Sequence, residues 1–522
     1  MRRYVAKNFL LSGVMLSTFF IMPASTSAET LSLNVEEAVE LALENNRIIE
    51  QRAEDREKAK WRLSEVRRNS GLRFTWDSSS ARIGGRYYHT LRSPRYQIYG
   101  MSPQERATYN ISDISYYPQY QSSNSNSFRL SLPLYTGGQL ENQRKSARYG
   151  LNSADLNLED AKQQIKWQTE QAYYQAMQYR DSIDAQQEAI NLLNEHLRTV
   201  QIQFEVGTVA MSDVLATSVQ LANSQQAFNN AQANYENALA TLNNIMGLPV
   251  DTNLILNREE KYSTLTTSEA DCLKYALEHR PDGIAAAYAV KQAQAAVSST
   301  KSGFRPSVSA VIQGSMVGEG AFKANQTKEM WSAGIQLSWN IFDNNVTSAQ
   351  VQQAKADQRK AESAARQQIE QIQMEIRKAY ANLKIAEKNI SVTKKAIKQA
   401  EEEFLIAKAR YEEGVDTNLA VMDAQEKLTL ARTNYSAAVY NYNTSKAQLE
   451  KAMGIPIDID AAIYAKSVEE GNVAEKALKD SAQVPLKIFD ADGKIRKRSQ
   501  EDIRPIANSS EEAVEPFTEG EE

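Results

Sequence analysis

The stretch FEVGTVAMSDVL, residues 204–215, has a relative 207 positions further along the chain, YEEGVDTNLAVM, residues 411–422. Gly207 in the first stretch aligns with Gly414 in the second. Long segments almost free of proline and glycine flank both stretches, which is typical of two helices joined by a short turn. Glycine suits such a turn because it adopts positive φ without strain. The sequence therefore predicts the same helix–turn–helix unit twice.

The two turns belong to a duplication that covers most of the chain. Three further pairs of segments match: ALENNR (42–47) with ALEHRP (276–281), NSGLRFTW (69–76) with KSGFRPSV (301–308), and NNIMGLPVD (243–251) with EKAMGIPID (450–458). The chain divides into a signal peptide (1–28), a first repeat (29–250), a linker (251–267), a second repeat (268–460) and a polar tail (461–522). The tail ends in a run of acidic residues, and we expect most of it to be disordered.

The N-terminus has the pattern of a secretory signal peptide. Arg2, Arg3 and Lys7 precede an apolar run, and small residues follow at Thr26 and Ala28. The run is too short for a membrane anchor, and no later apolar run reaches the length of about 18 residues that a membrane-spanning helix needs. If the exported chain spans a membrane, it must therefore do so with strands.

Each repeat contains one very long predicted helix. Between Gly138 and Gly207, and again between Asn345 and Gly414, lie 68 residues without proline and with Gly150 as the only glycine. Each segment is long enough for a helix of about 100 Å. Small, apolar and glutamine side chains recur along the first segment at spacings of four and three, which predicts coiled-coil packing.

Shorter helices complete each repeat. A return helix follows each turn and ends at a glycine, Gly247 or Gly454. Two further helices are predicted at 35–69 and 269–301, each preceded by a capping residue. In each repeat the two shorter helices together match the length of the outward helix. We therefore expect a long helical barrel, with the two glycine turns at its far end.

Four segments alternate apolar and polar side chains, as outer-membrane strands do. The apolar sets are Leu72, Phe74 and Trp76; Phe128, Leu130, Leu132 and Leu134; Val308, Ala310 and Ile312; and Trp331, Ala333, Ile335, Leu337, Trp339 and Ile341. Alternation alone also fits ordinary half-buried strands of a soluble sheet. A tyrosine-, serine- and proline-rich insert in the first repeat predicts a long surface loop at 77–127.

Strand number sets the predicted assembly. Four strands cannot close a barrel, and lipid does not tolerate open sheet edges. Two copies give eight strands, whose interior is filled by side chains, so three copies form the smallest assembly with a water-filled lumen. The predicted fold class is an α+β membrane protein. It has a long α-helical coiled-coil barrel, two internal repeats, and four strands per chain in a shared trimeric β-barrel.

Composition and motifs indicate no enzymatic chemistry. The single cysteine, Cys272, excludes an internal disulfide, and three widely separated histidines give no metal-ligand spacing. The sequence contains no P-loop, no GxSxG and no HExxH motif, so we expect no enzyme activity, cofactor or metal. The formal net charge of −5 does not favour nucleic acid, and no such partner is expected.

The two stretches that open this section, with the helices that follow them, resemble the TolC-type outer-membrane efflux proteins. The pattern that carries the resemblance is aromatic-x-x-Gly, then Asp-Val-Leu, then Tyr and Leu at helical intervals. The second stretch departs from it, since it reads LAVMDAQ (419–425) in place of Asp-Val-Leu. The similarity spans about residues 31–460. The resemblance implies a homotrimer in the lipid of the outer membrane, with an α-helical tunnel across the periplasm. It also implies a periplasmic membrane-fusion adaptor protein and an inner-membrane pump or ABC transporter as partners.

The implied function is that of the exit duct of a tripartite efflux or type I secretion system. Cargo is not distinguished, because a passive tunnel reads it weakly. The alternative is a trimeric coiled-coil structural or surface protein without a channel. Matched hairpin lengths in the two repeats argue against that alternative, since a simple spacer needs no return path.

The tips supply the candidate site residues. For adaptor docking we select Gly207, Asp213, Gly414 and Val415. In the resembling family, acidic residues at the second tip line a pore constriction, so the candidates for it are Asp423, Asp416, Glu412 and Glu413. By position Asp423 matches one such acid, whereas Ala420 stands at the place of another. Three copies around one axis would bring these carboxylates together and favour cations.

Overall fold

The structure is a computed structural model and describes residues 31–83, 104, 121–258, 265–319, 327–470, 483–485 and 503–505. The signal peptide, the centre of the long surface loop and most of the acidic tail lie outside these residues. Among the helices described, none is both long and apolar enough to cross a membrane.

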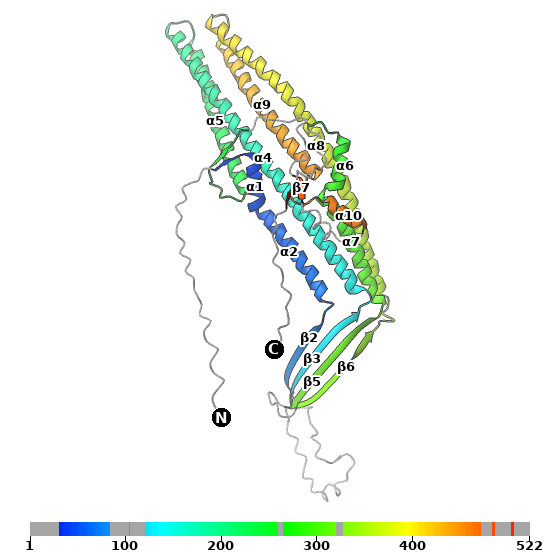
Figure 1. The fold of residues 1–522 in the computed structure, drawn as a ribbon. Helices are drawn as coiled ribbons and strands as arrows, with labels where there is room; N and C mark the ends of the chain where they lie inside the picture. Colours follow the sequence, from blue (N-terminus) through cyan, green and yellow to red (C-terminus); the bar gives the residue numbers. More distant parts are fainter. Residues whose placement is uncertain are drawn as a thin grey trace.

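Two long helical hairpins dominate the molecule (Figure 1). In the first repeat, α4 (Gln139–Glu205) turns into α5 (Met211–Ile245). In the second repeat, α8 (Val346–Glu412) turns into α9 (Asn418–Met453). The two outward helices are therefore confirmed almost to the residue, because nothing between their flanking glycines or asparagine can end a helix. Buried residues of the predicted α4 seam are Ala161, Ile165, Ala172, Ala176, Ile190, Leu193 and Val200.

The two shorter helices expected at 35–69 and 269–301 are each broken once. They form α1 (Val35–Asn45) with α2 (Arg47–Arg68), and α6 (Glu269–His279) with α7 (Pro281–Thr300). Asn46 and Arg280 hold extended backbone, with ψ of 127° and 123°. Each side chain donates to the end of a return helix: Asn46 to the Ile245 carbonyl at 2.7 Å, and Arg280 to the Ala452 carbonyl at 3.1 Å.

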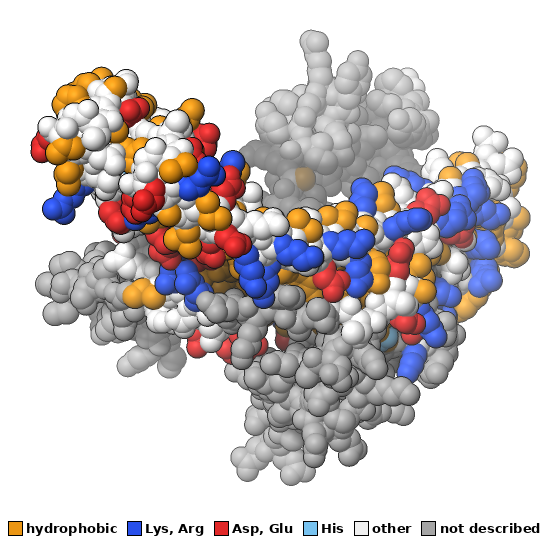
Figure 2. Space-filling model, turned by 90° about the horizontal axis from the view of Figure 1, so that it is seen from above, with side chains coloured by type: hydrophobic (Ala, Val, Ile, Leu, Met, Phe, Trp, Pro, Cys, Tyr) orange, Lys and Arg blue, Asp and Glu red, His pale blue; other side chains and the backbone are white. Residues whose placement is uncertain are grey.

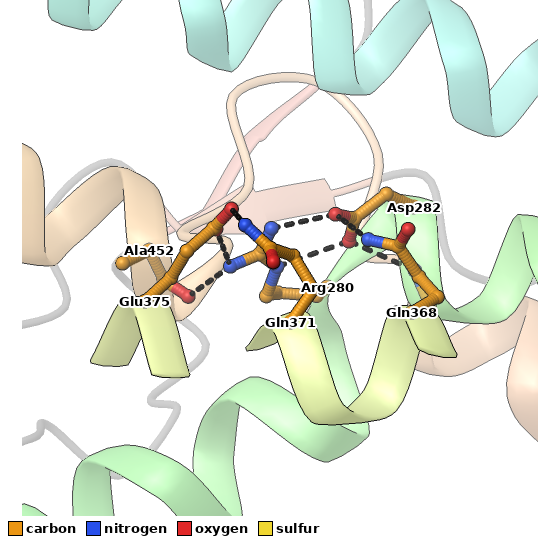
Figure 3. A network of polar contacts seen from close by, with 7 residues as sticks. Arg280, Asp282, Gln368, Gln371, Glu375 and Ala452 are labelled. Carbon is orange, nitrogen blue, oxygen red and sulfur yellow. Dashed lines mark hydrogen bonds and ion pairs between the residues drawn. The ribbon is translucent and has the colours of Figure 1, made fainter. Parts of the chain in front are cut away.

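Arg280 is the centre of a buried polar network at the α6–α7 break (Figure 3). Its guanidinium is 3% exposed and lies 2.5 Å from Asp282 and 2.7 Å from Glu375 of α8. Burial alone would raise the pKa of both carboxyls, but the hydrogen bonds and charge of Arg280, with Gln371 on Glu375, lower each pKa below its ordinary value. This network joins α6, α7, α8 and α9.

The helices form a layer whose order differs between its two ends. Towards the sheet, α2 packs on α4, α4 on α7, and α7 on α8. Towards the tips, α4 packs between α5 and α9, and α9 packs on α8. Helix α8 is thus one lateral edge near the sheet and near the tips, and α6 packs on it in between. The other edge is formed by α2 near the sheet and by α5 near the tips.

A four-stranded antiparallel sheet lies at the end opposite the tips (Figure 1). It contains β2 (Arg73–Ile83), β3 (Gln121–Tyr135), β5 (Ser307–Glu319) and β6 (Thr327–Ser338), in the order β2-β3-β5-β6. The four predicted strands are confirmed, but β6 ends before the predicted Trp339 and Ile341, and β2 begins after Leu72. Strands β2 and β3 extend into the segment expected as loop 77–127, because serine and asparagine pairs such as Ser79 with Ser125 continue the ladder without apolar side chains. Strands β2 and β6 are the two edges.

Large apolar side chains cover one face of this sheet and are exposed. They are Phe74, Trp76, Ile312, Trp331, Ile335 and Leu337. A row of exposed aromatic and aliphatic side chains at alternate positions is the pattern of a lipid-facing surface.

A small mixed unit packs near the middle of the helical layer. Here β1 (Leu31–Leu33) pairs in parallel with β4 (Leu254–Leu256), and the Tyr173 hydroxyl donates to the Leu33 carbonyl at 3.1 Å. The boundary expected at residue 460 is wrong, because the packed fold continues into α10 (Ala462–Glu470). The buried Tyr464 holds it there, with its hydroxyl donating to Asp155 at 3.0 Å. Further along, β7 (Gln483–Pro485) pairs with β8 (Ile503–Pro505).

Candidate functional site: the two helical tips

The first tip is a tight turn held by backbone hydrogen bonds. Gly207 has φ of +81°, as predicted for a helix-to-helix turn. The Gly207 N–H donates to the Phe204 carbonyl at 2.9 Å, and the Thr208 N–H donates to the Gln203 carbonyl at 2.8 Å. A Cβ built at Gly207 meets no atom within 4 Å. The positive φ, and not a lack of space, is therefore what requires glycine here.

The second tip repeats this geometry. Gly414 has φ of +71°, and a Cβ there also meets nothing within 4 Å. The Val415 N–H donates to the Arg410 carbonyl at 2.9 Å. Unlike the first tip, this one has a side-chain cap, because the Thr417 hydroxyl accepts from the Ala420 N–H at 3.3 Å. The two tips share a backbone conformation but differ in how the N-terminus of the returning helix is capped.

Just inside the tips, one polar cluster joins all four helices. His196 of α4 is buried, and its Nε2 lies 2.7 Å from Oδ1 of Asn418, the first residue of α9. The Asn418 amide donates to the Thr217 hydroxyl of α5 at 3.0 Å and to the Asp213 carbonyl at 3.1 Å. The ring of Tyr411 on α8 meets the His196 ring edge-on, with centroids 5.1 Å apart. We call these residues, without Asp213, the tip hub.

The tip hub holds an uncharged imidazole. Burial lowers the pKa of His196 most, and the charge of Lys408 lowers it further. The hydrogen bond to Asn418 and the carboxylates of Glu412 and Glu195 act in the opposite direction but do not prevail. Since Asn418 Oδ1 accepts, the neutral ring carries its proton on Nε2. The hub and the surrounding core of Val200, Val214, Phe404, Val421 and Leu428 hold the two hairpins together.

The residues selected for docking lie where the sequence placed them. Gly207 and Gly414 are at the two turns, and Val415 is exposed beside the second. Asp213 is half-buried at the start of α5, and its carbonyl is bound by the tip hub. In Figure 2, hydrophobic side chains lie beside carboxylates at the left of the molecule, where Figure 1 places the tips. Exposed apolar side chains of the two tips are Phe204, Val206, Met211, Leu215, Val415 and Leu419.

The acidic candidates fall into two groups. Three of them are exposed: Glu412, Glu413 and Asp423. Asp416 is half-buried and has local partners, since its Oδ1 accepts from the Thr417 N–H at 2.8 Å and its Oδ2 lies 3.8 Å from Arg410 Nε. Asp416 therefore stabilises the second turn. Asp423 lies further along α9, where it adds to the effect of Glu403 in raising the pKa of Lys427.

The tip hub was not selected from the sequence as a site. Its signal lies in differences between the repeats. Asn418 of the second repeat aligns with Met211 of the first, and His196 of the first repeat aligns with Glu403 of the second. Neither buried polar residue is therefore repeated at the matching position of the other repeat. No group of three or more His, Cys, Asp or Glu residues in the described part of the chain is arranged to hold a metal ion.

Comparisons with known proteins agree with this architecture. The model of the family described as "Outer membrane efflux protein" matches residues 38–248 and 272–455. The alkaline protease secretion protein AprF of Pseudomonas aeruginosa is 24% identical over 346 residues, which cover 66% of this chain and 72% of AprF. The outer membrane protein TolC of Escherichia coli is 29% identical over 175 residues, which cover 28% of this chain and 36% of TolC.

Solved structures share the fold. The CmeC outer membrane channel of Campylobacter jejuni superposes with a TM-score of 0.66 at 19% identity, over 85% of this chain and 89% of CmeC. The open state of the Neisseria gonorrhoeae MtrE outer membrane channel gives a TM-score of 0.61 at 18% identity, over 80% of this chain and 88% of MtrE.

Proposed function

Because the chain belongs to the outer membrane efflux protein family, we propose that three copies of it form a continuous duct that works with a periplasmic adaptor and an inner-membrane transporter. The chain is an outer-membrane efflux channel whose helical part lies in the periplasm. Systems of this kind consist of an outer-membrane duct, an adaptor and an inner-membrane pump. The trimer, the docking site and the contact with lipid are what we propose beyond membership of the family.

One observation carries the proposal: the chain is polarised along its length. The sheet at one end exposes a row of large apolar side chains, with Trp331 among them, and suits the lipid of the outer membrane. Its free edges, β2 and β6, are completed by neighbouring copies. At the other end the two glycine turns present exposed apolar side chains, with Phe204 and Leu419 among them. We propose that this end docks helical hairpins of the adaptor.

Relatives differ in what their names say they move. AprF of Pseudomonas aeruginosa is named for the secretion of an alkaline protease, and TtgC of Pseudomonas putida is named for a toluene efflux pump. We propose the same passive role for this chain, with the cargo chosen by the inner-membrane partner.

The pore constriction is proposed at the second tip. Asp423 is the first choice, because it is exposed on α9 and no hydrogen bond within the described chain engages its carboxylate. Asp416 is second, since Arg410 and the Thr417 N–H already engage it. Glu412 and Glu413 are exposed at the turn and are weaker candidates.

Deletion and complementation in the source organism test the proposal. Two readouts suffice: cellular retention of ethidium and the amount of protein secreted. We expect deletion to change at least one, and the wild-type chain to restore it. A Gly207→Leu plus Gly414→Leu chain should insert in the outer membrane without restoring export. A Gly207→Asn plus Gly414→Asn chain is the matched control, because asparagine tolerates positive φ. If deletion leaves both readouts unchanged, the proposed function is wrong.

A further inference from the structure

One contact inside the chain joins the two repeats at the base of the sheet. The corner after β3, Gly137–Gly138, rests on the segment before β5. Nη1 of Arg305 donates to the Gly137 carbonyl at 3.2 Å. A Cβ built at Gly137 would lie 3.0 Å from the Ser302 carbonyl oxygen and 3.3 Å from the Ser302 Cβ. This contact holds β3 of the first repeat beside β5 of the second repeat.

The duplication supplies both parts of this contact a second time. The segment Ser302-Gly-Phe-Arg305 aligns with Ser70-Gly-Leu-Arg73 of the first repeat, and the Gly137–Gly138 corner aligns with Asn344–Asn345. The asparagine corner has the same left-handed backbone. Its φ values are +53° and +65°, compared with +66° and +90° for the glycines. In the described residues, no other non-glycine residue has positive φ.

Within one chain the Ser70–Arg73 segment and the Asn344–Asn345 corner do not meet. The Ser70–Arg73 segment lies at the β2 edge and borders an open pocket of about 550 Å³. Residues that line the pocket are Trp61, Ser64, Glu65, Arg68, Asn69, Gly71, Leu72, Arg73 and Phe74. The Asn344–Asn345 corner lies at the other edge, after β6.

The two corners differ in how well they are covered. Ile341 and Phe342, just before the asparagine corner, are 81% and 84% exposed. Their counterparts before the glycine corner, Leu134 and Tyr135, are 54% and 46% exposed. The helices show the same imbalance. Helix α7 packs between α4 and α8, whereas its counterpart α2 packs on α4 and leaves its other side open within the described chain.

We infer that the Asn344–Asn345 corner of a neighbouring copy occupies this pocket, and that Arg73 donates to its Asn344 carbonyl as Arg305 donates to Gly137. The inference rests on the proposed homotrimer and names the residues that join its copies. The contact is head-to-tail, because the pocket and the corner lie on opposite edges. Such contacts form a ring when the rotation between copies closes, as it does in the proposed trimer. It covers Phe342 and places α8 of one copy beside α2 of the next.

The asparagine corner is chemically suited to this pocket. The Gly137–Gly138 corner offers only backbone groups, and the Gly137 carbonyl is the group that binds Arg305. A pair of asparagines adds two side-chain amides, each with donors and an acceptor. Ser64, Glu65 and Arg68 line the pocket and provide matching groups. Asparagine is also the non-glycine side chain that best tolerates left-handed backbone. Because a Cβ at Gly137 would lie 3.0 Å from the Ser302 carbonyl oxygen, the Asn344 corner must sit slightly further from its partner segment than Gly137 does.

Disulfide trapping tests the contact. By analogy with Ser302 and Gly137, the Cβ atoms of Ser70 and the neighbour's Asn344 should come within the range of a disulfide. The Ser70→Cys plus Asn344→Cys chain, oxidised in membranes, should therefore run as dimers and trimers on a denaturing gel without reductant. Either single variant should run as monomer. Ser302→Cys plus Gly137→Cys is the within-chain control, and should change monomer mobility without forming oligomers.

The outcomes separate the inference from the proposal on which it rests. If the double-cysteine protein is trimeric by native mass spectrometry but forms no interchain disulfide, the inference fails and the trimer stands. If the wild-type chain is monomeric, both fail. A second measurement is independent of cysteines: Arg73→Ala should lower the dissociation temperature of the native trimer by several degrees. Arg67→Ala, at an exposed position near the end of α2 and outside the pocket, should not. Equal dissociation temperatures for Arg73→Ala and wild type overturn the inference.

Discussion

Tyr411, His196, Thr217 and Asn418 show how single residues decide what the tips can do. Each comes from a different helix, and their ring contact and hydrogen bonds meet at one buried point. A buried imidazole paired with an amide is stable only while the ring is neutral. Protonation of His196 should therefore weaken the tip hub.

The lowered pKa of His196 predicts weaker tips in acid. Above about pH 6.5, the ordinary histidine value, both native and unfolded states are neutral, so stability does not depend on this group. As pH falls through 6.5 the unfolded state binds the proton first, so the free energy of unfolding decreases until pH reaches the lower folded-state pKa. Hydrogen exchange of tip amides between pH 8 and pH 5 measures this loss.

The matched variant for this test is His196→Gln. Its side-chain amide can still donate to Asn418 but does not titrate in this range. We expect the decrease in protection between pH 6.5 and pH 5 to be smaller in His196→Gln than in wild type. The same decrease in both proteins would show that another group controls the tips.

Removing acids at the second tip should change ion selectivity. If three copies of Asp423 surround the axis, Asp423→Ala should shift the reversal potential in a salt gradient towards anions. Asp416→Ala should have a smaller effect, because its carboxylate already engages Arg410 and the Thr417 N–H. Single-channel recordings of both single variants and the double variant check this. Wild-type selectivity in the double variant would exclude these residues from the constriction.

At the scale of elements, the breaks at Asn46 and Arg280 attach the short helices to the ends of the return helices α5 and α9. Removing Arg280 leaves Asp282 and Glu375 without the cation that neutralises them. Breaking a buried ion pair typically costs 3–5 kcal/mol, and we expect about 3 kcal/mol for Arg280→Met because both carboxylates are partly exposed. Asn46→Ala, in the matching position of the first repeat, removes only neutral hydrogen bonds and should cost about 1 kcal/mol. Urea unfolding of both variants tests the difference, and equal losses would contradict it.

The segment after α9 is attached to α4 through a buried carboxyl. Glu159 accepts hydrogen bonds from the N–H groups of Ile457, Asp458 and Ile459, at 2.7, 3.3 and 3.3 Å. Burial outweighs these bonds and raises the pKa of Glu159 from 4.5 to about 7. Between these values the native state holds a proton that the unfolded state has lost. Stability should therefore fall as pH rises from 4.5 to 7.

Glu159→Gln tests this attachment because glutamine keeps an acceptor but does not titrate. The variant should lose the part of the pH dependence of the unfolding midpoint that falls between pH 4.5 and pH 7. Thermal unfolding in buffers across that range measures it. An unchanged pH dependence would mean that Glu159 is ionised in the native protein throughout this range.

Elements with a strong periodic pattern could be predicted from the sequence. Helix breaks that depend on one side chain and a distant partner could not. The bounds of α4 and α8 followed from the absence of proline and glycine over 68 residues. The breaks at Asn46 and Arg280 did not, because their cause is a hydrogen bond to a carbonyl about 200 or 170 residues away. The ends of β2 and β3 were missed because serine on both faces hides the alternation. Tyr464 anchors α10 to Asp155, a contact that periodicity cannot reveal.

At the scale of the whole molecule, the duplication explains the shape. Two copies of one helix–strand–helix plan lie side by side, so the layer has a first-repeat edge at α2 and α5 and a second-repeat edge at α8. The sheet repeats this with β2 and β6. Opposite edges of this kind call for further copies of the same chain. The tip turns were predicted because glycine there is a local requirement. The tip hub was missed because it needs four helices to be placed first.

Conductance of the purified protein in a planar bilayer tests the central claim most directly. Wild-type trimers should give small discrete current steps if the constriction that we propose at the second tip narrows the duct. Asn418→Ala, which removes the central amide of the tip hub, should give larger steps as the hairpins separate. A bilayer that contains trimers of both proteins, verified by gel, and passes no stepwise current for either would contradict the account and identify the chain as a spacer without a channel.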